Sequence, residues 1–230
     1  MGLFKSIKRK IILFQNLLSK DLKIKKKNII ITGANSGLGL ALVKALNLDN
    51  NILATRNLLR ICNENKIKKF IFASSSEVYG DQKKFPLFEN FETQNKTIYG
   101  ISKIVGEKYI KGFFQKYKLD YNIIRFFNVY GPGQNNNFVI SKYIQRIKKN
   151  KPLEVYGNGT QIRSFCYIED AISGVMNIIY RGKKNTTYNI GNDKEPISIL
   201  KLTKLIKSIC KKKIIVKKVD FKHSDRKKER

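Results

Sequence analysis

The sequence has a single histidine, three cysteines, no tryptophan and few acidic side chains, and these shortages exclude several kinds of site. His223 alone cannot support Ser-His-Asp catalysis, Cys-His catalysis or a histidine-based metal centre, so no metal is expected. Cys62, Cys166 and Cys210 form no CxxC pair, which argues against a disulfide framework and favours a reducing cytoplasm. No apolar run reaches the roughly 18 residues of a membrane-spanning helix, and no secretory signal is evident.

The shortage of acidic residues leaves a formal net charge of +30, with 47 Lys and Arg against 17 Asp and Glu. Such a charge attracts polyanions. However, lysine, isoleucine, asparagine, phenylalanine and tyrosine are all abundant, and these are the residues of A/T-rich codons. Base composition therefore accounts for the charge, and we expect no specific nucleic-acid partner because no recognition motif accompanies it.

Residues 1–27 form a separate basic segment with apolar residues on one helical face. The pattern predicts an amphipathic N-terminal extension. It would either make weak contact with an anionic membrane surface or pack on its own domain, and the second interpretation is favoured.

A glycine-rich turn follows the first apolar strand, Asn28–Thr32. Gly33, Gly37 and Gly39 lead directly into a helical pattern. A strand that runs through glycines into a helix N-terminus is typical of phosphate binding, so these glycines are candidate cofactor-binding residues.

The rest of the chain alternates between strand and helix patterns, which predicts an α/β fold with a parallel sheet flanked by helices. Expected strands are 70–74, 121–127, 153–156, 188–190 and 214–216, and expected helices are 99–117, 138–148, 169–180 and 199–210.

Tyr99 and Lys103 are the first candidates for chemistry, because a spacing of four places them on one helix face. An ammonium beside a phenol favours the phenolate, so Lys103 is expected to lower the pKa of Tyr99. Tyr99 would then serve as an acid or base. The pair follows a strand that ends in SSSEVYG, and ligands bind at the carboxyl ends of such strands.

Four segments in this order, KFIFASSSEVYG, YGISKIVGEKY, YNIIRFFNVYGPGQ and PLEVYGNGTQIRSFCYIEDA, resemble the extended short-chain dehydrogenase/reductase family. This family contains the NAD-dependent epimerases, dehydratases and decarboxylases of nucleotide sugars. The resemblance covers about residues 51–199 and implies a Rossmann-like fold with a small C-terminal substrate lobe.

The resemblance also implies roles for individual residues. Tyr99 would be the base that removes a hydroxyl proton while NAD accepts the hydride, and Lys103 would hold the cofactor ribose. Ser75 would hydrogen-bond the reacting oxygen. Asn128 and Arg163 would contact the diphosphate of the substrate, where a cation suits the phosphates.

Glu77 bears on the subgroup, because sugar 4,6-dehydratases carry an Asp-Glu pair where this chain has Ser76-Glu77. The resemblance therefore favours an epimerase acting on a UDP-hexose, with Glu77 as a further catalytic candidate. A UDP-glucuronate decarboxylase or a 4,6-dehydratase relative is the alternative. Many relatives pair through the helix that bears the Tyr/Lys motif, which implies a homodimer.

Two features depart from the family. The glycine loop reads TGxxxGxG where extended members have TGxxGxxG, and Ile29 lies only 41 positions before Phe70. A βαβ unit takes roughly 30 residues, so the second to fourth strands would be missing. We expect an internal deletion, or a fusion of two reductase genes, that lets the first strand pair directly with the Phe70 strand.

The expected organisation is an extension (1–27), a shortened NAD-binding domain (28–150) and a truncated nucleotide-sugar lobe (151–230). Loss of half the cofactor cleft leaves open whether the chain is an enzyme. The alternative is a non-catalytic remnant that no longer holds NAD.

Overall fold

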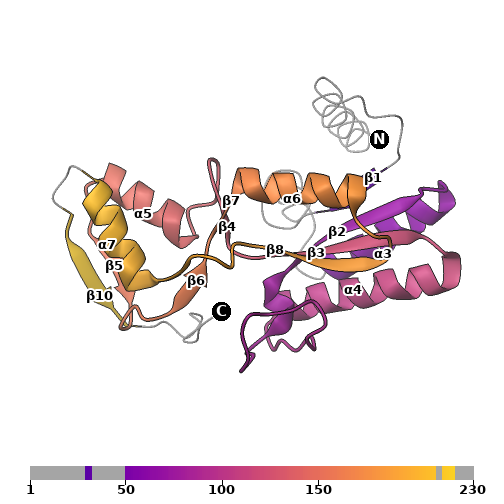
Figure 1. The fold of residues 1–230 in the computed structure, drawn as a ribbon, viewed down its shortest axis with the longest axis horizontal. Helices are drawn as coiled ribbons and strands as arrows, with labels where there is room; N and C mark the ends of the chain where they lie inside the picture. Colours follow the sequence, from indigo (N-terminus) through magenta and orange to yellow (C-terminus); the bar gives the residue numbers. More distant parts are fainter. Residues whose placement is uncertain (1–28, 33–49, 211–213, 221–230) are drawn as a thin grey trace, which may run out of the picture.

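The structure is a computed structural model that describes residues 29–32, 50–210 and 214–220. Figure 1 shows an elongated molecule with a helix-covered sheet at one end and a smaller lobe at the other. The expected N-terminal extension and the loop that contains Gly33, Gly37 and Gly39 lie outside the described residues.

Four strands, all parallel to their neighbours, form the main sheet in the order β1–β2–β3–β8. Their bounds are β1 Ile29–Thr32, β2 Lys69–Ser75, β3 Asp120–Phe126 and β8 Thr186–Ile190. The parallel α/β fold is therefore confirmed. Strand β1 lies directly beside β2, with Ile30 opposite Phe70, which confirms that the first strand pairs with the Phe70 strand.

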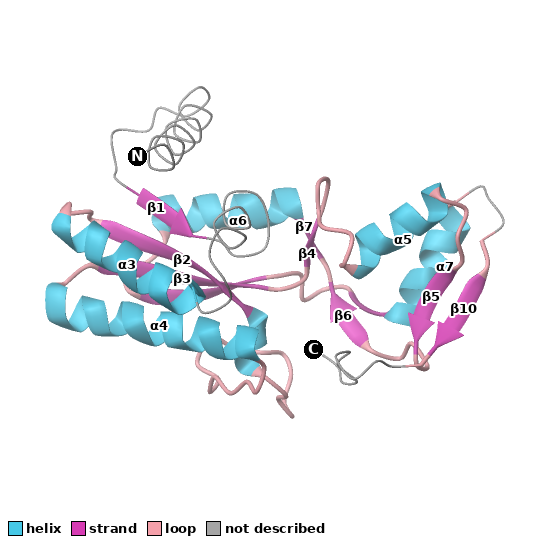
Figure 2. Ribbon diagram, turned by 180° about the vertical axis from the view of Figure 1, so that it is seen from behind, coloured by secondary structure: helices cyan, strands magenta, loops and turns pink. Residues whose placement is uncertain are grey.

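Helices cover both faces of this sheet (Figures 1 and 2). Helices α3 (Asn50–Glu64) and α4 (Ile98–Tyr117) pack on one face, and α6 (Ile168–Arg181) packs on the other. Alternation along β2 explains this, because successive side chains of a strand point to opposite faces. Phe70 and Phe72 belong to the core under α3 and α4, whereas Ile71 belongs to the core under α6.

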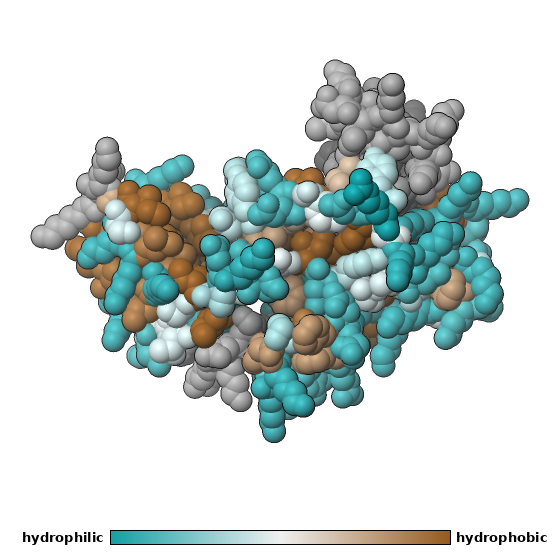
Figure 3. Space-filling model, in the orientation of Figure 1, coloured by the Kyte–Doolittle hydropathy of each residue, from teal (hydrophilic) through white to brown (hydrophobic). Residues whose placement is uncertain are grey.

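The smaller lobe contains two helices and a pair of parallel strands, with Tyr143, Leu153 and Ile214 as its buried core. The elements are α5 (Val139–Lys148), β5 (Leu153–Tyr156), α7 (Ile199–Ile209) and β10 (Val216–Val219). Figure 3 shows hydrophobic residues gathered on this lobe, while the opposite end of the molecule is mostly hydrophilic.

Short elements connect the two parts. Strand β4 (Val129–Tyr130) pairs with β7 (Cys166–Tyr167), and β6 (Ile162–Ser164) pairs with β9 (Pro196–Ser198). A 3-10 helix, η1 (Ser76–Tyr79), follows β2. The sequence analysis predicted none of these short elements.

The chain passes back and forth between the two parts, so a linear boundary at residue 150 is too simple. Helix α5 lies in the smaller lobe although it precedes this boundary, whereas β8 follows it and pairs with β3 in the main sheet. Among the described helices, none has the length and apolarity needed to cross a membrane.

Candidate active site

The predicted catalytic residues meet at the carboxyl end of β2. Ser75 is the last residue of this strand, and its Oγ accepts a hydrogen bond from the backbone N–H of Glu77 at 3.2 Å. Tyr99, in the first turn of α4, lies beside the Ser75 side chain, which acts to lower the pKa of the Tyr99 phenol. The structure thus brings a phenol and a hydroxyl together where ligands bind in parallel sheets.

The pKa of Tyr99 is raised, which differs from the expectation. Burial is the largest cause, and the negative charge of Glu77 raises the pKa further, whereas the neighbouring Ser75 side chain lowers it. The Lys103 ammonium lies 5.7 Å from the centroid of the Tyr99 ring and is not among these causes. In this arrangement Tyr99 is held as the neutral phenol in the ligand-free chain.

Lys103 is almost completely buried, with 4% of its surface exposed. Its Nζ donates a hydrogen bond to the backbone carbonyl of Ala73 at 2.8 Å and lies 5.1 Å from the centroid of the Phe72 ring. Burial lowers the pKa of Lys103 to about 8, although the negative charge of Glu107 opposes this shift. The ammonium is therefore close to losing its proton at mildly alkaline pH.

Helix α4 approaches β2 closely because glycine occupies the contact point. A Cβ on Gly106 would lie 2.7 Å from Cζ of Phe72. The start of the helix is fixed by Thr97, whose Oγ1 accepts from the N–H of Gly100 at 3.1 Å. Asn95 joins this end to η1, because its Nδ2 donates to the Glu77 carbonyl and its Oδ1 accepts from Thr97 N–H.

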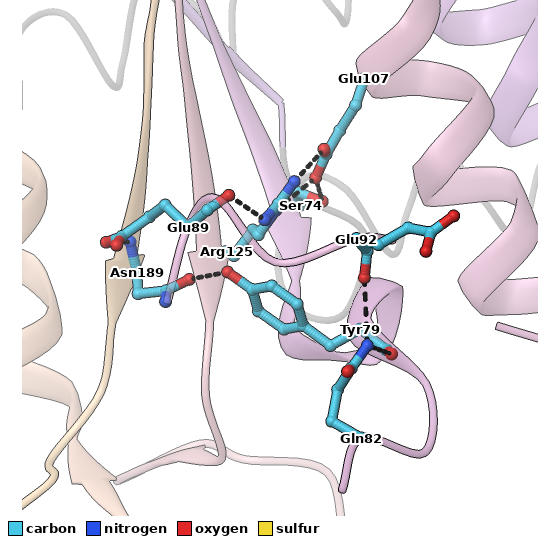
Figure 4. A network of polar contacts seen from close by, with 8 residues as sticks. All are labelled: Ser74, Tyr79, Gln82, Glu89, Glu92, Glu107, Arg125 and Asn189. Atoms are coloured by element: carbon cyan, nitrogen blue, oxygen red, sulfur yellow. Dashed lines mark hydrogen bonds and ion pairs between the residues drawn. The ribbon is translucent and has the colours of Figure 1, made fainter. Parts of the chain in front are cut away.

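A buried polar network adjoins these residues (Figure 4). Glu107 accepts hydrogen bonds from Ser74 and from Arg125, and the Arg125 guanidinium lies over the Tyr79 ring. Tyr79 in turn donates to Asn189 of β8 at 2.7 Å. The sequence analysis missed this network. Two signals were available, namely the spacing of four between Lys103 and Glu107 and a lone arginine within the apolar run of β3.

Asn128 and Arg163 line a second feature, a pocket of about 300 Å³ beside the smaller lobe. Asn128 Nδ2 donates to the Ser164 carbonyl at 3.2 Å, and Arg163 Nη1 donates to the Ile162 carbonyl at 2.7 Å. The pocket is also lined by aromatic and charged side chains that the sequence analysis did not select, including Tyr130, Phe138, Lys142, Glu154, Tyr156 and Phe165.

The structure thus brings the predicted residues together in two groups. Ser75, Glu77, Tyr99 and Lys103 lie around the end of β2, and Asn128 and Arg163 lie in the pocket. Within the described part of the chain, no group of three or more His, Cys, Asp or Glu residues is placed to hold a metal ion.

A parallel sheet covered by helices on both faces, with a partly exposed Tyr and a buried Lys at one strand end, defines a Rossmann-like α/β protein. The model of the "NAD dependent epimerase/dehydratase family" matches residues 23–191, and the chain belongs to that family.

Individual relatives agree with this assignment. The chain is 37% identical over 167 residues to the uncharacterized UDP-glucose epimerase YtcB of Bacillus subtilis, covering 71% of this chain and 52% of that protein. It therefore spans about half the length of that relative.

Solved structures give the same result. The UDP-N-acetylglucosamine 4-epimerase of Methanobrevibacter ruminantium, in complex with UDP-N-acetylmuramic acid, matches with a TM-score of 0.78 and 30% identity over 91% of this chain and 70% of that one. The UDP-glucuronic acid 4-epimerase of Bacillus cereus, in complex with UDP-glucuronic acid and NAD, matches with a TM-score of 0.71 and 31% identity, covering 80% and 58%.

Proposed function

We propose that this chain acts as a nucleotide-sugar 4-epimerase that uses NAD and a UDP-hexose. The observation that carries the proposal is the placing of Ser75 and Tyr99 side by side next to the buried Lys103, at the carboxyl end of a parallel strand. Tyr99, once converted to the phenolate, would remove the proton of the sugar hydroxyl and later return it. Ser75 would hold the same sugar oxygen in place, and Lys103 would stabilise the phenolate when it forms.

The described residues fit the nicotinamide end of NAD. The Lys103 ammonium has three N–H donors, and one of them is directed to the Ala73 carbonyl, so the others suit ribose hydroxyls. Bound there, NAD supplies a reversible hydride acceptor for the sugar carbon. Gly33, Gly37 and Gly39 would hold its phosphates in this proposal.

The pocket with Asn128 and Arg163 suits the diphosphate of the substrate. Arg163 provides a cation for the phosphates, and Tyr130 and Tyr156 supply aromatic surface beside it. The two solved structures described above are each in complex with a UDP-linked sugar acid. These ligands support a UDP-hexose as the substrate class. Glu77 lies near Tyr99 and would tune its charge or contact the sugar.

A second candidate is a non-catalytic remnant, and one observation favours it. In the described residues β1 lies directly beside β2, so the sheet has no strand between them. A shortened sheet offers less surface to the adenosine half of NAD. In this alternative the sugar-nucleotide pocket persists without cofactor binding.

We further propose a homodimer that pairs through α4. Ile101, Tyr109 and Tyr117 of this helix are exposed, and a groove lined by Val105, Tyr109 and Phe113 runs along it. Contact of residues 1–27 with an anionic membrane surface stays a prediction. A cytoplasmic location is supported by three free thiols, two of which are buried.

The deciding experiment is a titration of the purified protein with NADH, following the fluorescence of NADH itself. We expect saturable enhancement at micromolar NADH, followed by 4-epimerisation of UDP-glucose with added NAD. Tyr99→Phe should still bind NADH but lose at least about 100-fold in turnover.

Absence of enhancement up to millimolar NADH, in protein that circular dichroism shows to be folded, would overturn the enzyme proposal. It would favour the non-catalytic remnant. Binding of UDP to such a protein would then support the persistence of the pocket.

A further inference from the structure

Glu107 is a buried carboxylate with hydrogen bonds at both oxygens, and 3% of its surface is exposed. Its Oε1 accepts from Ser74 Oγ at 2.6 Å and from Arg125 Nε at 3.0 Å. Its Oε2 accepts from Arg125 Nη2 at 2.7 Å. Such a paired, forked contact has defined geometry, so it fixes α4 against β2 and β3 at one position.

The network extends beyond Glu107 through Arg125 to the loop after η1 and to β8. Arg125, of which 2% is exposed, also donates to the Glu89 carbonyl at 3.1 Å. Asn189 of β8 accepts from Tyr79 and donates through Nδ2 to the Leu87 carbonyl at 2.9 Å. Figure 4 shows these side chains converging between η1, β3 and β8.

Two links connect Glu107 to the candidate catalytic residues. Ser74 directly precedes Ser75 in β2, so the hydrogen bond from Ser74 holds the strand end beside which Tyr99 lies. Lys103 lies one helical turn before Glu107, and the carboxylate raises the pKa of this lysine against the effect of burial.

We propose that Glu107 is a positioning residue for the Tyr99/Lys103 pair, which anchors α4 to the ends of β2 and β3 and keeps the buried Lys103 ammonium charged. The role of the pair in epimerisation rests on the proposed function. The anchoring and the charge of Lys103 do not, because they are properties of the folded chain alone.

Other groups also face these two charges. Tyr99 lies beside Lys103 on α4. Arg125 and Tyr121 of β3 face Glu107, and Tyr79 of η1 faces Arg125. Burial raises the pKa values of Tyr79 and Tyr121 and so keeps both side chains neutral. Two cations, Lys103 and Arg125, therefore act on the Glu107 carboxylate, while the negative charges of Glu77 and Glu89 act on Tyr99 and Tyr79.

The test is to measure the titration of Lys103 directly by NMR, in protein carrying ¹³C-labelled lysine. Surface lysines titrate near 10.4, so a signal with a midpoint near 8 stands apart, and Lys103→Met identifies it by removing it. In Glu107→Gln the midpoint should fall by about one pH unit. The matched control, Glu64→Gln, removes an exposed carboxylate and should leave the midpoint unchanged.

An unpaired Arg125 can prevent folding of the single variant, so the double variant Glu107→Gln with Arg125→Met is made as well. It removes both charges and leaves no unpaired guanidinium. The double variant is compared with Arg125→Met, because loss of the Arg125 cation raises the Lys103 midpoint and offsets loss of the carboxylate. A Lys103 midpoint that is the same in the wild type and in folded Glu107→Gln, or the same in Arg125→Met and in the double variant, would overturn the proposal. Turnover of UDP-glucose is measured separately, so failure of the proposed function leaves the Lys103 measurement valid.

Discussion

At the scale of single residues, the buried amine of Lys103 makes the stability of the fold depend on pH. Its pKa is lowered from 10.5 to about 8 in the folded chain. Between these values the unfolded chain binds more protons than the folded chain, so stability rises with pH in this window. Below pH 8 both states carry the proton, and the cost of burying the charge is present in full.

Replacing Lys103 by Met removes this dependence. The free energy of unfolding of the wild type should gain about 3 kcal/mol between pH 8 and 10.5 relative to Lys103→Met, because each unit of pKa shift corresponds to about 1.4 kcal/mol. Urea denaturation at several pH values measures the difference. The variant also serves to subtract the titration of buried tyrosines, which both proteins share. Parallel pH profiles for the two proteins would contradict the expected shift.

At the scale of elements, α4 carries Tyr99, Lys103 and Glu107 on the face that packs on the sheet. Two glycines of this helix make a matched pair. A Cβ at Gly106 would lie 2.7 Å from the Phe72 ring, whereas a Cβ at Gly112 would have no atom within 4 Å. The same substitution should therefore have opposite effects at the two positions.

We expect Gly106→Ala to destabilise the fold by about 1–3 kcal/mol, because the added methyl group overpacks the contact with β2. Gly112→Ala should stabilise it by about 1 kcal/mol through helix propensity. Thermal melts followed by circular dichroism give both values. Equal effects at the two positions would show that α4 does not pack on Phe72 as described.

Regular elements around the site were predictable from the sequence because their patterns are long. The run of β2 and the periodicity of α4 extend over enough residues to define a strand and a helix. Strands β4 and β7 have two residues each, which is too short for any period to show. The pair of Glu107 and Arg125 depends on tertiary contact between α4 and β3, which residue spacing does not reveal. Residue spacing also does not reveal how far Tyr99 is removed from water, so the direction of its pKa shift was not predicted.

At the scale of the whole molecule, the two groups of candidate residues lie in different places, so binding of the two proposed ligands can be tested separately. Arg163 lines the pocket, whereas Lys103 lies against the carboxyl end of β2. Arg163→Ala should weaken UDP binding at least about 10-fold by loss of a charge-assisted contact, while the NADH affinity stays unchanged. Isothermal titration calorimetry with UDP and the NADH fluorescence titration measure the two. Equal losses for both ligands would argue for a general disruption of the fold.

The repeated passage of the chain between the sheet and the smaller lobe has a consequence for folding. The lobe receives α5 and β5, the chain returns to the sheet for α6 and β8, and it then supplies α7 and β10 to the lobe. The sheet is complete only once β8 has been made, and the lobe only once β10 has been made. Sheet and lobe are therefore expected to acquire their structure late in synthesis and to unfold in one cooperative transition, and a cut between β5 and α6 would disrupt both parts at once.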